Sequence, residues 1–518
     1  MFETAELGRE LTKKAFKARV PSLREALLST QFKLREAGLP VIILFAGVDG
    51  AGKGETVNLL NEWMDPRWIS TRSFDDPSVA SLERPHYWRF WAGLPPNGQI
   101  GLLLSAWYSQ PLLKRVYGDI SNAAFDQKLD EIQNLEQTLA DDGALILKFW
   151  MHLGKDAQEE RFKSFEADPL LEWRVTERDW KHWRMYDEFI ANAERLISRT
   201  SVGHAPWHIV EGYDQNYRSI RVAELILEAM QARLEANRVR EELRKVSAAA
   251  PAVAPADSED TGDSVTVDVP GPLTVLSRLD MSLDLQNGDY KKALREQQAR
   301  LNSLHRQAFK RGLTTVLVFE GSDAAGKGGA IRRCVAALDA RQVTIVPVAK
   351  PTDEEYAHHY LWRFWRHLPR AGRVLIFDRS WYGRVLVERV EGFASEEEWR
   401  RAYGEINAFE SQLVEHGIVL LKFWLHISAD EQLERFNARE VTPHKRWKLT
   451  DEDWRNRERW QEYEEAVHDM VERTSTRASP WVLVAANSKR YARVKVITSV
   501  CDALENALAR TDSETEHD

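Results

Sequence analysis

Short apolar runs alternate with longer polar stretches in the C-terminal half of the chain. The apolar runs are bounded by turn residues and predict buried strands at 314–320, 343–348, 374–378, 418–427 and 481–485. The polar, periodic stretches between them predict helices, and residues 279–310 are expected to be helical ahead of the first strand. Alternation of strands with helices is typical of a parallel sheet covered on both faces. The pattern therefore predicts an α/β fold, a three-layer α/β/α sandwich around a parallel sheet of about five strands.

The N-terminal half carries the same pattern, displaced by a constant number of positions. The segment AGVDGAGKGETV begins at Ala46 and EGSDAAGKGGAI begins at Glu320, so Lys53 and Lys327 are 327 − 53 = 274 positions apart. The same shift matches WRFW, WY, KFW, RF, DW and PW, which begin at 88, 107, 148, 161, 179 and 206 in the first half. A constant offset over that span indicates a tandem duplication of one domain, and the length of the unit excludes short solenoid repeats.

A segment of different composition separates the two copies. Residues 247–272 are rich in Ala, Pro, Ser and Asp and contain few large apolar residues, which is typical of a flexible linker. We therefore expect an N-terminal domain at 1–245, a linker at 246–272 and a C-terminal domain at 273–510. The polar tail at 511–518 is expected to be disordered.

Composition narrows the class of protein. The chain has 518 residues, which favours two domains, and 43% of them are hydrophobic and 29% charged. No run reaches the roughly 18 apolar residues of a membrane span, and the N-terminus lacks a secretory signal. Two cysteines exclude a disulfide framework, so we expect a cytoplasmic protein without membrane contact. A net charge of −9 argues against non-specific binding of nucleic acid, so any polyanion must meet a local basic cluster.

The segment GSDAAGKG at 321–328 fits the phosphate-binding pattern GxxxxGK, between a predicted strand and a predicted helix. Such a loop directs backbone N–H groups, here near Gly326, Gly328 and Gly329, at a phosphate, and the helix N-terminus adds positive potential. Lys327 supplies a charge for the transferring phosphoryl oxygens. The alternative is a glycine-rich turn that binds no ligand, but strand, glycines and lysine coincide here.

Glycine replaces the Ser or Thr that normally ends this pattern and helps to hold Mg²⁺. Mg²⁺ usually takes one or two carboxylates together with substrate phosphates and water. Asp323 inside the loop and Asp378 at the end of the third predicted strand are the candidate metal ligands, because ligand sites lie at the carboxyl ends of parallel strands. The alternatives are an exposed turn aspartate for Asp323 and a helix cap for Asp378.

Many cations fall at predicted strand ends and in RFNAREVTPHKRWK, a segment with little apolar periodicity that begins at Arg435. As a group they predict a phosphate-binding cluster with a helical lid, since the arginine fork pairs with two phosphate oxygens and a closing lid excludes water. For a single residue, a solvated charged helix is the stronger alternative. The tryptophans are expected mainly to pack rather than to stack on a base. The candidate phosphate- or nucleotide-binding cations are Lys350, Arg363, Arg384, Arg389, Arg435, Arg439 and Lys445.

The segments GSDAAGKGGAI, VAKPT, YLWRFWRHLP, FDRSWYGRVLVERV and RWKLTDEDW resemble the polyphosphate kinase 2 family, and the fused form is similar to its two-domain, AMP-using members. The resemblance implies tandem P-loop kinase-like domains and Mg²⁺-dependent (or Mn²⁺-dependent), reversible transfer of a terminal polyphosphate phosphoryl group to AMP, giving ADP. It implies that Asp323 and Asp378 handle the metal, that Lys327 and Arg379 bind the reacting phosphates, and that Arg439 comes from the lid. Other nucleoside mono- or diphosphates are further candidate acceptors, and a homodimer is an alternative assembly.

The first copy departs from the family pattern. Shifted by 274 positions, Asp378 becomes Leu104 and Arg379 becomes Ser105, although Asp49 and Lys53 of the loop survive. The counterparts of Lys350, Arg384, Arg439 and Lys445 are Asp76, Gln110, Phe165 and Leu171. Without the second carboxylate and the lid cations, charge that develops in the reaction loses its stabilisation. We expect the first copy to be inactive. Two roles then remain open for it: it still binds phosphate, or it serves as an internal dimer partner of the second copy.

Two other functions fit the same loop. An ATP-dependent nucleoside monophosphate kinase of the thymidylate-kinase type would share the fold, and a phosphate- or nucleotide-sensing protein would keep the loop without turnover. A nucleic-acid translocase is disfavoured by the acidic balance. The sequence leaves the preferred acceptor, the favoured direction and the chain length of the donor open.

Overall fold

The computed structural model describes residues 1–74, 76–249, 275–442 and 451–515. They form two compact units. The first contains Met1–Pro77 and the chain from Gly93 to the end of its last helix, together with Ala357–His359, and the second contains Ser78–Ala92 and the rest of the described chain. In the described part of the chain, no helix is long and apolar enough to cross a membrane.

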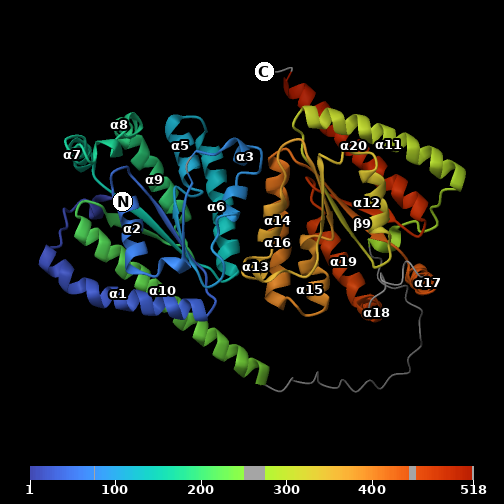
Figure 1. Ribbon diagram of the computed structural model, residues 1–518, viewed down its shortest axis with the longest axis horizontal. Helices are drawn as coiled ribbons and strands as arrows, with labels where there is room; N and C mark the ends of the chain where they lie inside the picture. Colours follow the sequence, from blue (N-terminus) through green and yellow to red (C-terminus); the bar gives the residue numbers. More distant parts are fainter. Residues whose placement is uncertain (75, 250–274, 443–450, 516–518) are drawn as a thin grey trace, which may run out of the picture. The chain divides into compact units, whose positions relative to one another are not determined.

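Each unit is built on one parallel sheet of five strands (Figure 1). In the second unit the order is β10-β9-β6-β8-β7, and in the first it is β2-β3-β1-β4-β5, which is the same topology in the two copies. The strands are β1 (Val41–Gly47), β2 (Ile69–Ser73), β3 (Ile100–Leu104), β4 (Leu145–His152), β5 (Trp207–Glu211), β6 (Thr315–Gly321), β7 (Val343–Pro347), β8 (Val374–Asp378), β9 (Val419–His426) and β10 (Trp481–Ala485). The α/β/α fold class and the tandem arrangement predicted from the sequence are confirmed.

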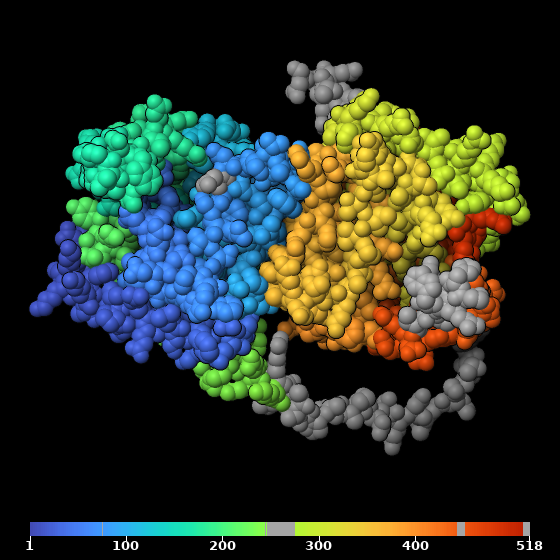
Figure 2. All heavy atoms as spheres, viewed as in Figure 1, coloured from blue at the N-terminus to red at the C-terminus, as the bar shows by residue number. Residues whose placement is uncertain are grey.

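Helices cover both faces of the second sheet. On one face α12 and α20 pack on the strands and α11 packs on α20, and on the other face α16 packs on β9 and on α19 (Figure 1). The helices of this unit are η4 (Leu276–Arg278), α11 (Asn287–Lys310), α12 (Lys327–Val335), α13 (Asp353–Tyr356), α14 (Trp362–His367), η5 (Trp381–Val385), α15 (Val387–Val390), α16 (Glu396–Glu415), α17 (Ala429–Glu440), α18 (Asp451–Glu458), α19 (Trp460–Thr474) and α20 (Lys489–Thr515). In the space-filling view, α17 and α18 (orange-red) lie at the surface of the unit (Figure 2).

The first unit repeats this plan, with α1 packed on α10 as α11 is on α20. Its helices are η1 (Glu3–Ala5), α1 (Lys13–Glu36), α2 (Lys53–Trp63), η2 (Pro66–Trp68), α5 (Ser109–Tyr117), α6 (Asn122–Asp141), α7 (Lys155–Glu166), η3 (Glu172–Arg174), α8 (Glu177–Arg184), α9 (Tyr186–Thr200) and α10 (Gln215–Ala249). The short helices α3 (Val79–Leu82) and α4 (Trp88–Trp91) lie in the segment that belongs to the second unit.

The element boundaries differ from the predicted ones at a few places. The helix ahead of β6 begins at Asn287 rather than near 279, and α10 continues into the first residues of the predicted linker. The tail predicted to be disordered from 511 begins as helix, because α20 runs to Thr515. The remainder of the predicted linker, residues 250–272, lies outside the described residues, as do the first two residues of the predicted C-terminal domain.

The core of each unit contains a buried ion pair. Lys422 Nζ on β9 lies 2.7 Å from Glu410 Oε2 on α16, and both side chains are at most 1% exposed. Both groups make further hydrogen bonds within the same unit: Lys422 donates to Thr474 O, and Glu410 accepts from Trp381 Nε1. Lys148 and Glu136 form the same pair in the first copy, at 2.7 Å. Buried charges of this kind are tolerated only when they are paired and hydrogen-bonded, so the pair belongs to the framework of the fold.

Candidate functional site

The phosphate loop joins β6 to α12 and needs glycine at both of its ends. Gly321 has φ +151°, and a Cβ there would lie 2.4 Å from Leu425 O, so a side chain does not fit. Gly326 caps α12 with φ +109°, a conformation that glycine adopts without strain. A Cβ at Gly328 would meet nothing within 4 Å, so contacts of the fold do not require glycine at this position. The Gly329 N–H donates to Gly326 O and is thus already used inside the first turn.

Lys327 folds back over this loop. Its Nζ donates to Gly321 O at 2.6 Å and lies 3.5 Å from Ser322 O. Burial lowers the pKa of the Lys327 ammonium, while the carboxylates of Asp323, Glu320 and Asp378 act in the opposite direction. The lysine therefore lies within electrostatic reach of both aspartates that the sequence singled out.

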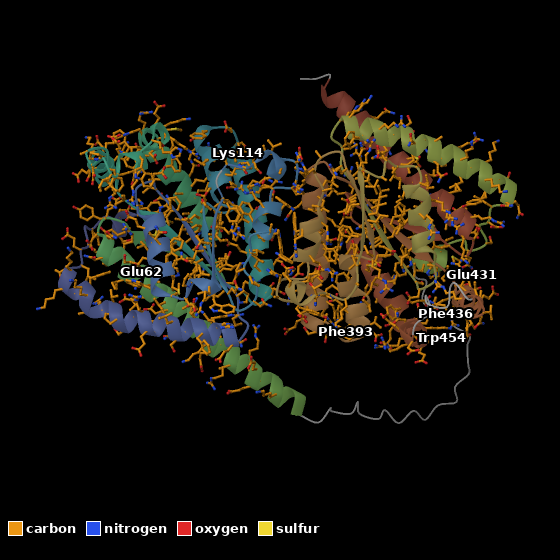
Figure 3. All side chains as sticks on the ribbon, viewed as in Figure 1. Glu62, Lys114, Phe393, Glu431, Phe436 and Trp454 are labelled. Carbon is orange, nitrogen blue, oxygen red and sulfur yellow. The ribbon has the colours of Figure 1, made fainter. Side chains whose placement is uncertain are left out.

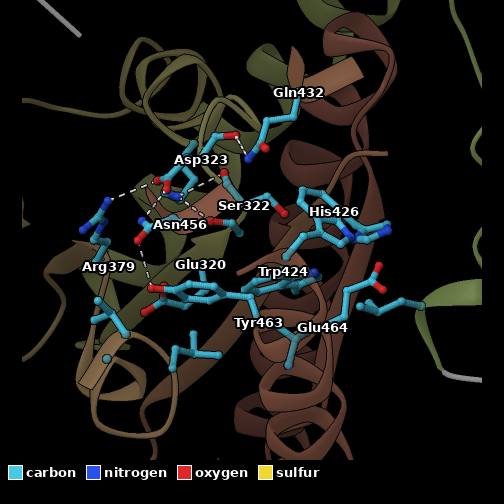
Figure 4. A pocket seen from close by; sticks show the side chains of 18 residues that line it. Glu320, Ser322, Asp323, Arg379, Trp424, His426, Gln432, Asn456, Tyr463 and Glu464 are labelled. Carbon is cyan, nitrogen blue, oxygen red and sulfur yellow. Dashed lines mark hydrogen bonds and ion pairs between the residues drawn. The ribbon is translucent and has the colours of Figure 1, made fainter. Parts of the chain in front are cut away.

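Asp323 is held from two sides, and its side chain is 15% exposed. Arg379 Nη2 lies 3.3 Å from its Oδ1, and Asn456 Nδ2 donates to its Oδ2 at 2.9 Å (Figure 4). Tyr463 OH in turn donates to Asn456 Oδ1 at 3.2 Å, and Gln432 Nε2 donates to Asp323 O at 3.2 Å. Arg379 and Asn456 thus fix the orientation of the loop carboxylate, and Gln432 holds the backbone beside it.

Asp378 is the last residue of β8 and pairs in register with Phe319, two positions before Gly321. The Asp378 carboxylate makes no hydrogen bond or ion pair with the described residues, so the described part of the chain leaves its oxygens available to a ligand. In the described chain no three His, Cys, Asp or Glu side chains are arranged to hold a metal ion. Two carboxylates beside a phosphate site fit a hard cation that completes its coordination with phosphate oxygens and water.

The residue after β8 is strained. Arg379 has φ +66°, a left-handed conformation that a non-glycine residue rarely adopts, and its N–H donates to Phe319 O. Such strain costs on the order of 1–3 kcal/mol and is typical of functional sites. Next to it, Ser380 Oγ donates to the buried carboxylate of Glu320 at 2.8 Å. Burial raises the pKa of Glu320, which Ser380 and Lys327 lower in part.

Arg435 was predicted to bind phosphate, but in the structure it binds backbone carbonyl groups of the protein. Its guanidinium donates to Ala324 O and Ala325 O of the loop and to Ala486 O and Asn487 O beyond β10, and Nε pairs with Glu431. With every N–H group engaged, Arg435 braces the loop and is not available to phosphate. In the first copy Arg161 donates to Gly50 O, Gly212 O and Tyr213 O, so this brace is common to both copies.

The other predicted cations are distributed over the unit. Arg363 lies 3.5 Å from Glu355, Arg384 lies 3.3 Å from Glu388, and Arg389 donates to Asp469 at 2.7 Å, so these three are neutralised within the protein. Lys350 is exposed after β7. Arg439 lies near the end of the lid helix α17, and Lys445 lies outside the described residues. The structure therefore brings Asp323, Lys327 and Arg379 together, with Asp378 within electrostatic reach of Lys327.

The lid helices pack through aromatic rings. Phe436 on α17 and Trp454 on α18 meet edge to face, with ring centroids 5.2 Å apart (Figure 3). Phe162 and Trp180 repeat the contact in the first copy at 5.3 Å. These tryptophans pack between helices, as the sequence predicted.

A pocket of about 790 Å³, open solvent included, lies between the loop and α19 (Figure 4). Asp323, Lys327 and Arg379 line it together with a set of apolar and aromatic side chains. Those side chains are Leu276, Leu386, Val387, Trp424, Trp460, Tyr463 and Val467. The phosphate loop, with Lys327 and the neighbouring Arg379, thus opens directly into a cavity that is partly walled by apolar side chains.

In the first copy, the charged side chains of the phosphate loop, Asp49 and Lys53, contact each other, and Asp49 also contacts His182. Asp49 Oδ2 and His182 Nδ1 lie 2.7 Å apart, and Lys53 Nζ lies 3.5 Å from Asp49 Oδ1. Burial raises the pKa of Asp49, but Lys53 and His182 outweigh it and lower the value to about 2. Ser105 keeps the strained conformation, with φ +51°, but supplies no cation. The first copy thus keeps the backbone of the site and the loop charges of Asp49 and Lys53, but it lacks the charges of Asp378 and Arg379.

Sequence reasoning missed Glu320, Gln432, Asn456 and Tyr463. Asn and Gln carry no charge and match no motif, and Asn456 reaches Asp323 over 133 positions, which only the tertiary fold determines. One available signal was the duplication itself. Arg435 and Gln432 keep the same residue type in the degenerate copy, as Arg161 and Gln158, which indicates a structural task rather than a catalytic one.

Comparisons with known proteins agree with this geometry. The family model "Polyphosphate kinase 2 (PPK2)" matches residues 10–238 and 284–512. A Pseudomonas aeruginosa protein named polyphosphate:AMP phosphotransferase is 51% identical over 98% of this chain and 99% of its own length. A protein of the same name from Acinetobacter johnsonii is 35% identical over 93% of this chain and 94% of its own. A crystal structure of a polyphosphate kinase 2 from Pseudomonas aeruginosa matches with a TM-score of 0.84 at 48% identity, covering 99% of this chain and 100% of that one.

Proposed function

Since this chain belongs to the polyphosphate kinase 2 family, we propose that its second copy transfers the terminal phosphoryl group of inorganic polyphosphate to AMP and releases ADP. The observation that carries the proposal is the grouping of Asp323, Lys327 and Arg379 at one pocket, with Asp378 within electrostatic reach of the lysine. The first copy lacks two of these four groups. Relatives that match over nearly the whole chain are named for the same reaction.

The transfer requires positioning and charge neutralisation rather than covalent catalysis. An oxygen of the AMP phosphate forms the new bond to the terminal phosphorus, the P–O bond to the rest of the chain breaks, and polyphosphate one unit shorter leaves. The attacking oxygen is already ionised, so no general base is needed. Lys327 and Arg379 neutralise phosphate oxygens, and the loop near Gly328 supplies backbone N–H groups. Because a phosphoanhydride is exchanged for another, the reaction is reversible in principle.

Mg²⁺ fits the donor set, with Asp323 and Asp378 as its protein ligands and Mn²⁺ as a substitute. When bound, the ion neutralises charge on the phosphate oxygens and orients them. Arg379 and Asn456 hold the Asp323 carboxylate in one orientation, which prepares it for this role. The two cysteines, Cys334 and Cys501, are free and buried, which supports a cytoplasmic location.

Donor identity tests this function directly. Purified protein is incubated with Mg²⁺ and AMP, with either polyphosphate or ATP as the sole donor, and products are separated by ion-exchange chromatography. We expect ADP formation with polyphosphate and at most trace formation with ATP. ADP formation from ATP alone would favour a nucleoside monophosphate kinase, and no turnover with either donor would favour a sensing protein. ADP, GMP and GDP in place of AMP define the range of acceptors.

Asn456 offers a test of the metal assignment. Asn456→Ala removes the hydrogen bond to Asp323 Oδ2, and loss of a partner that orients a metal ligand typically costs about 10–100-fold in activity or metal affinity. We expect the Mg²⁺ concentration for half-maximal rate to rise, with kcat recovering in part at high Mg²⁺. Asn456→His, which copies the contact of His182 with Asp49, is expected to retain more activity than the alanine variant. An unchanged Mg²⁺ dependence in Asn456→Ala would contradict the assignment.

A further inference from the structure

One side of the second-copy pocket is lined by apolar side chains, here called the apolar wall, and polyphosphate has no apolar group that could contact them. Trp424 from β9, Trp460 and Val467 from α19, and Leu276 from η4 line the same cavity as Lys327. Polyphosphate presents only charged and polar oxygens, and burying such groups against apolar side chains costs free energy. The wall therefore suits the part of the substrates that carries a flat, apolar face, which is the nucleoside of the acceptor.

His426 lines this wall, and one of its two ring nitrogens, Nδ1, has no hydrogen-bond partner among the described residues. Its side chain is buried, with 8% of the residue exposed. Burial lowers the pKa of His426 to about 4, so near pH 7 its ring is neutral and offers one donor and one acceptor. In the first copy, Nε2 of the equivalent His152 lies 2.7 Å from Glu6 Oε1. The residue in that place in the second copy is Asp280, which accepts from Ser282 instead.

The first copy shows what this space accepts. Phe2, the counterpart of Leu276, lies flat on His152 with ring centroids 4.6 Å apart and an angle of 10° between the planes. Phe2 is 4% exposed, so a side chain of the protein itself closes the space. Leu276 is shorter, and the second copy keeps a cavity lined by His426. A flat ring stacked on the histidine is thus the native occupant of this position in one copy, and the other copy leaves it for a ligand.

Glu464 adds an acceptor at the rim of the same cavity. It follows Trp460 by one helical turn of α19 and is exposed, and Figure 4 shows it on the same side of the pocket as His426. The first copy has Ile190 at this position. A carboxylate accepts a hydrogen bond from an exocyclic amino group and repels a carbonyl oxygen, so it discriminates between adenine and hypoxanthine at position 6.

We propose that the apolar wall is the adenine subsite of the acceptor, in which the base lies beside Trp424 and Trp460, and that Glu464 and His426 select the edge that carries the 6-amino group. This proposal rests on the proposed function, because the acceptor phosphate must reach Asp323 and Lys327 at the other end of the pocket. It deepens that function by assigning specificity to residues that no loop motif contains. A purine monophosphate with its 6-amino group intact is the preferred acceptor.

Glu464→Gln tests the selection. An amide can donate to a 6-oxo group as well as accept from a 6-amino group, so the ratio of kcat/KM for AMP to kcat/KM for IMP is expected to fall at least tenfold. The KM for polyphosphate is expected to stay within twofold of the wild type. If Glu464 only stabilised the fold, the substitution would not change the preference between AMP and IMP while leaving the KM for polyphosphate unchanged. Glu465→Gln on the same helix, outside the pocket lining, is the matched control. A ratio within twofold of the wild type in Glu464→Gln would overturn the assignment of Glu464.

Leu276→Phe tests the subsite itself, because it installs the aromatic ring that the first copy uses. We expect at least tenfold weaker AMP binding in titration calorimetry without polyphosphate, with the KM for polyphosphate within twofold, whereas Leu276→Met keeps AMP affinity. Unchanged AMP affinity in Leu276→Phe would overturn the proposal. Wild-type protein that binds AMP but makes no ADP from polyphosphate would contradict the proposed function and leave the subsite standing, so the two failures are distinguishable.

Discussion

Replacement of Asp378 by asparagine is expected to abolish ADP formation, lowering kcat on the order of 10³-fold, the scale of losing one preorganised charge-stabilising group. The side chain keeps its size, and the carboxylate has no hydrogen-bond or ion-pair partner among the described residues, so the fold should be unaffected. Steady-state rates at saturating polyphosphate, AMP and Mg²⁺ measure the effect. Rates above about a tenth of the wild type would contradict the placement of Asp378 in the reacting centre.

The duplication supplies a matched control for this prediction. Asp323→Asn and Asp49→Asn change the same residue at the same loop position in the two copies. We expect the first to reduce kcat as severely as Asp378→Asn. The second should leave kcat within twofold, because the equivalent strand of the first copy ends at Leu104 and is followed by Ser105, which supply no charge. Comparable losses in both variants would show that the first copy takes part in turnover.

Removal of one partner from the buried ion pair is expected to produce the largest loss of stability. Lys422→Met leaves the Glu410 carboxylate without its cation at a site that is at most 1% exposed. Breaking such a pair typically costs about 3–5 kcal/mol, because the remaining charge is buried and uncompensated. Urea unfolding followed by circular dichroism should show an earlier transition of the second unit, with the transition of the first unit unchanged.

Two further variants separate this explanation from simple loss of packing. The double variant Lys422→Met, Glu410→Leu removes both charges and should recover most of the lost stability. Arg400→Ala breaks an exposed pair with Glu396, whose side chains are 64% and 67% exposed, and should change stability by less than about 1 kcal/mol. Lys422 also donates to Tyr382 OH at 2.9 Å and to Thr474 O at 2.7 Å. A double variant as unstable as Lys422→Met would show that these hydrogen bonds matter more than the charge.

The strands could be predicted because their signal is local. A central strand of a parallel sheet is buried on both faces, so Val374–Asp378 appears in the sequence as an apolar run with the observed boundaries. The edge strand Trp481–Ala485 has a similar apolar run, and its predicted boundaries also match the observed ones. The loop could be predicted because its glycines are required by backbone geometry, as Gly321 shows. Asp378 could be identified because parallel strands end at one edge of the sheet.

The environment of the charges could not be predicted in this way. Arginine can bind phosphate or backbone carbonyls, and only the fold decides that Arg435 braces the loop while Arg379 faces Asp323. Asn456 and Tyr463 act through contacts between elements far apart in the sequence, and uncharged residues leave no motif. The disordered tail was predicted from polarity alone, but α20 continues through it to Thr515 because helix formation propagates from a packed helix.

The most direct test of the reacting centre is the binding of Mn²⁺, measured by electron paramagnetic resonance with polyphosphate present. The central claim is that Asp323 and Asp378 of the second copy hold one divalent ion beside Lys327. We predict one tightly bound ion per chain in the wild type and in Asp49→Asn, and at least tenfold weaker binding in Asp323→Asn and Asp378→Asn. Full-affinity binding in both second-copy variants would contradict the claim.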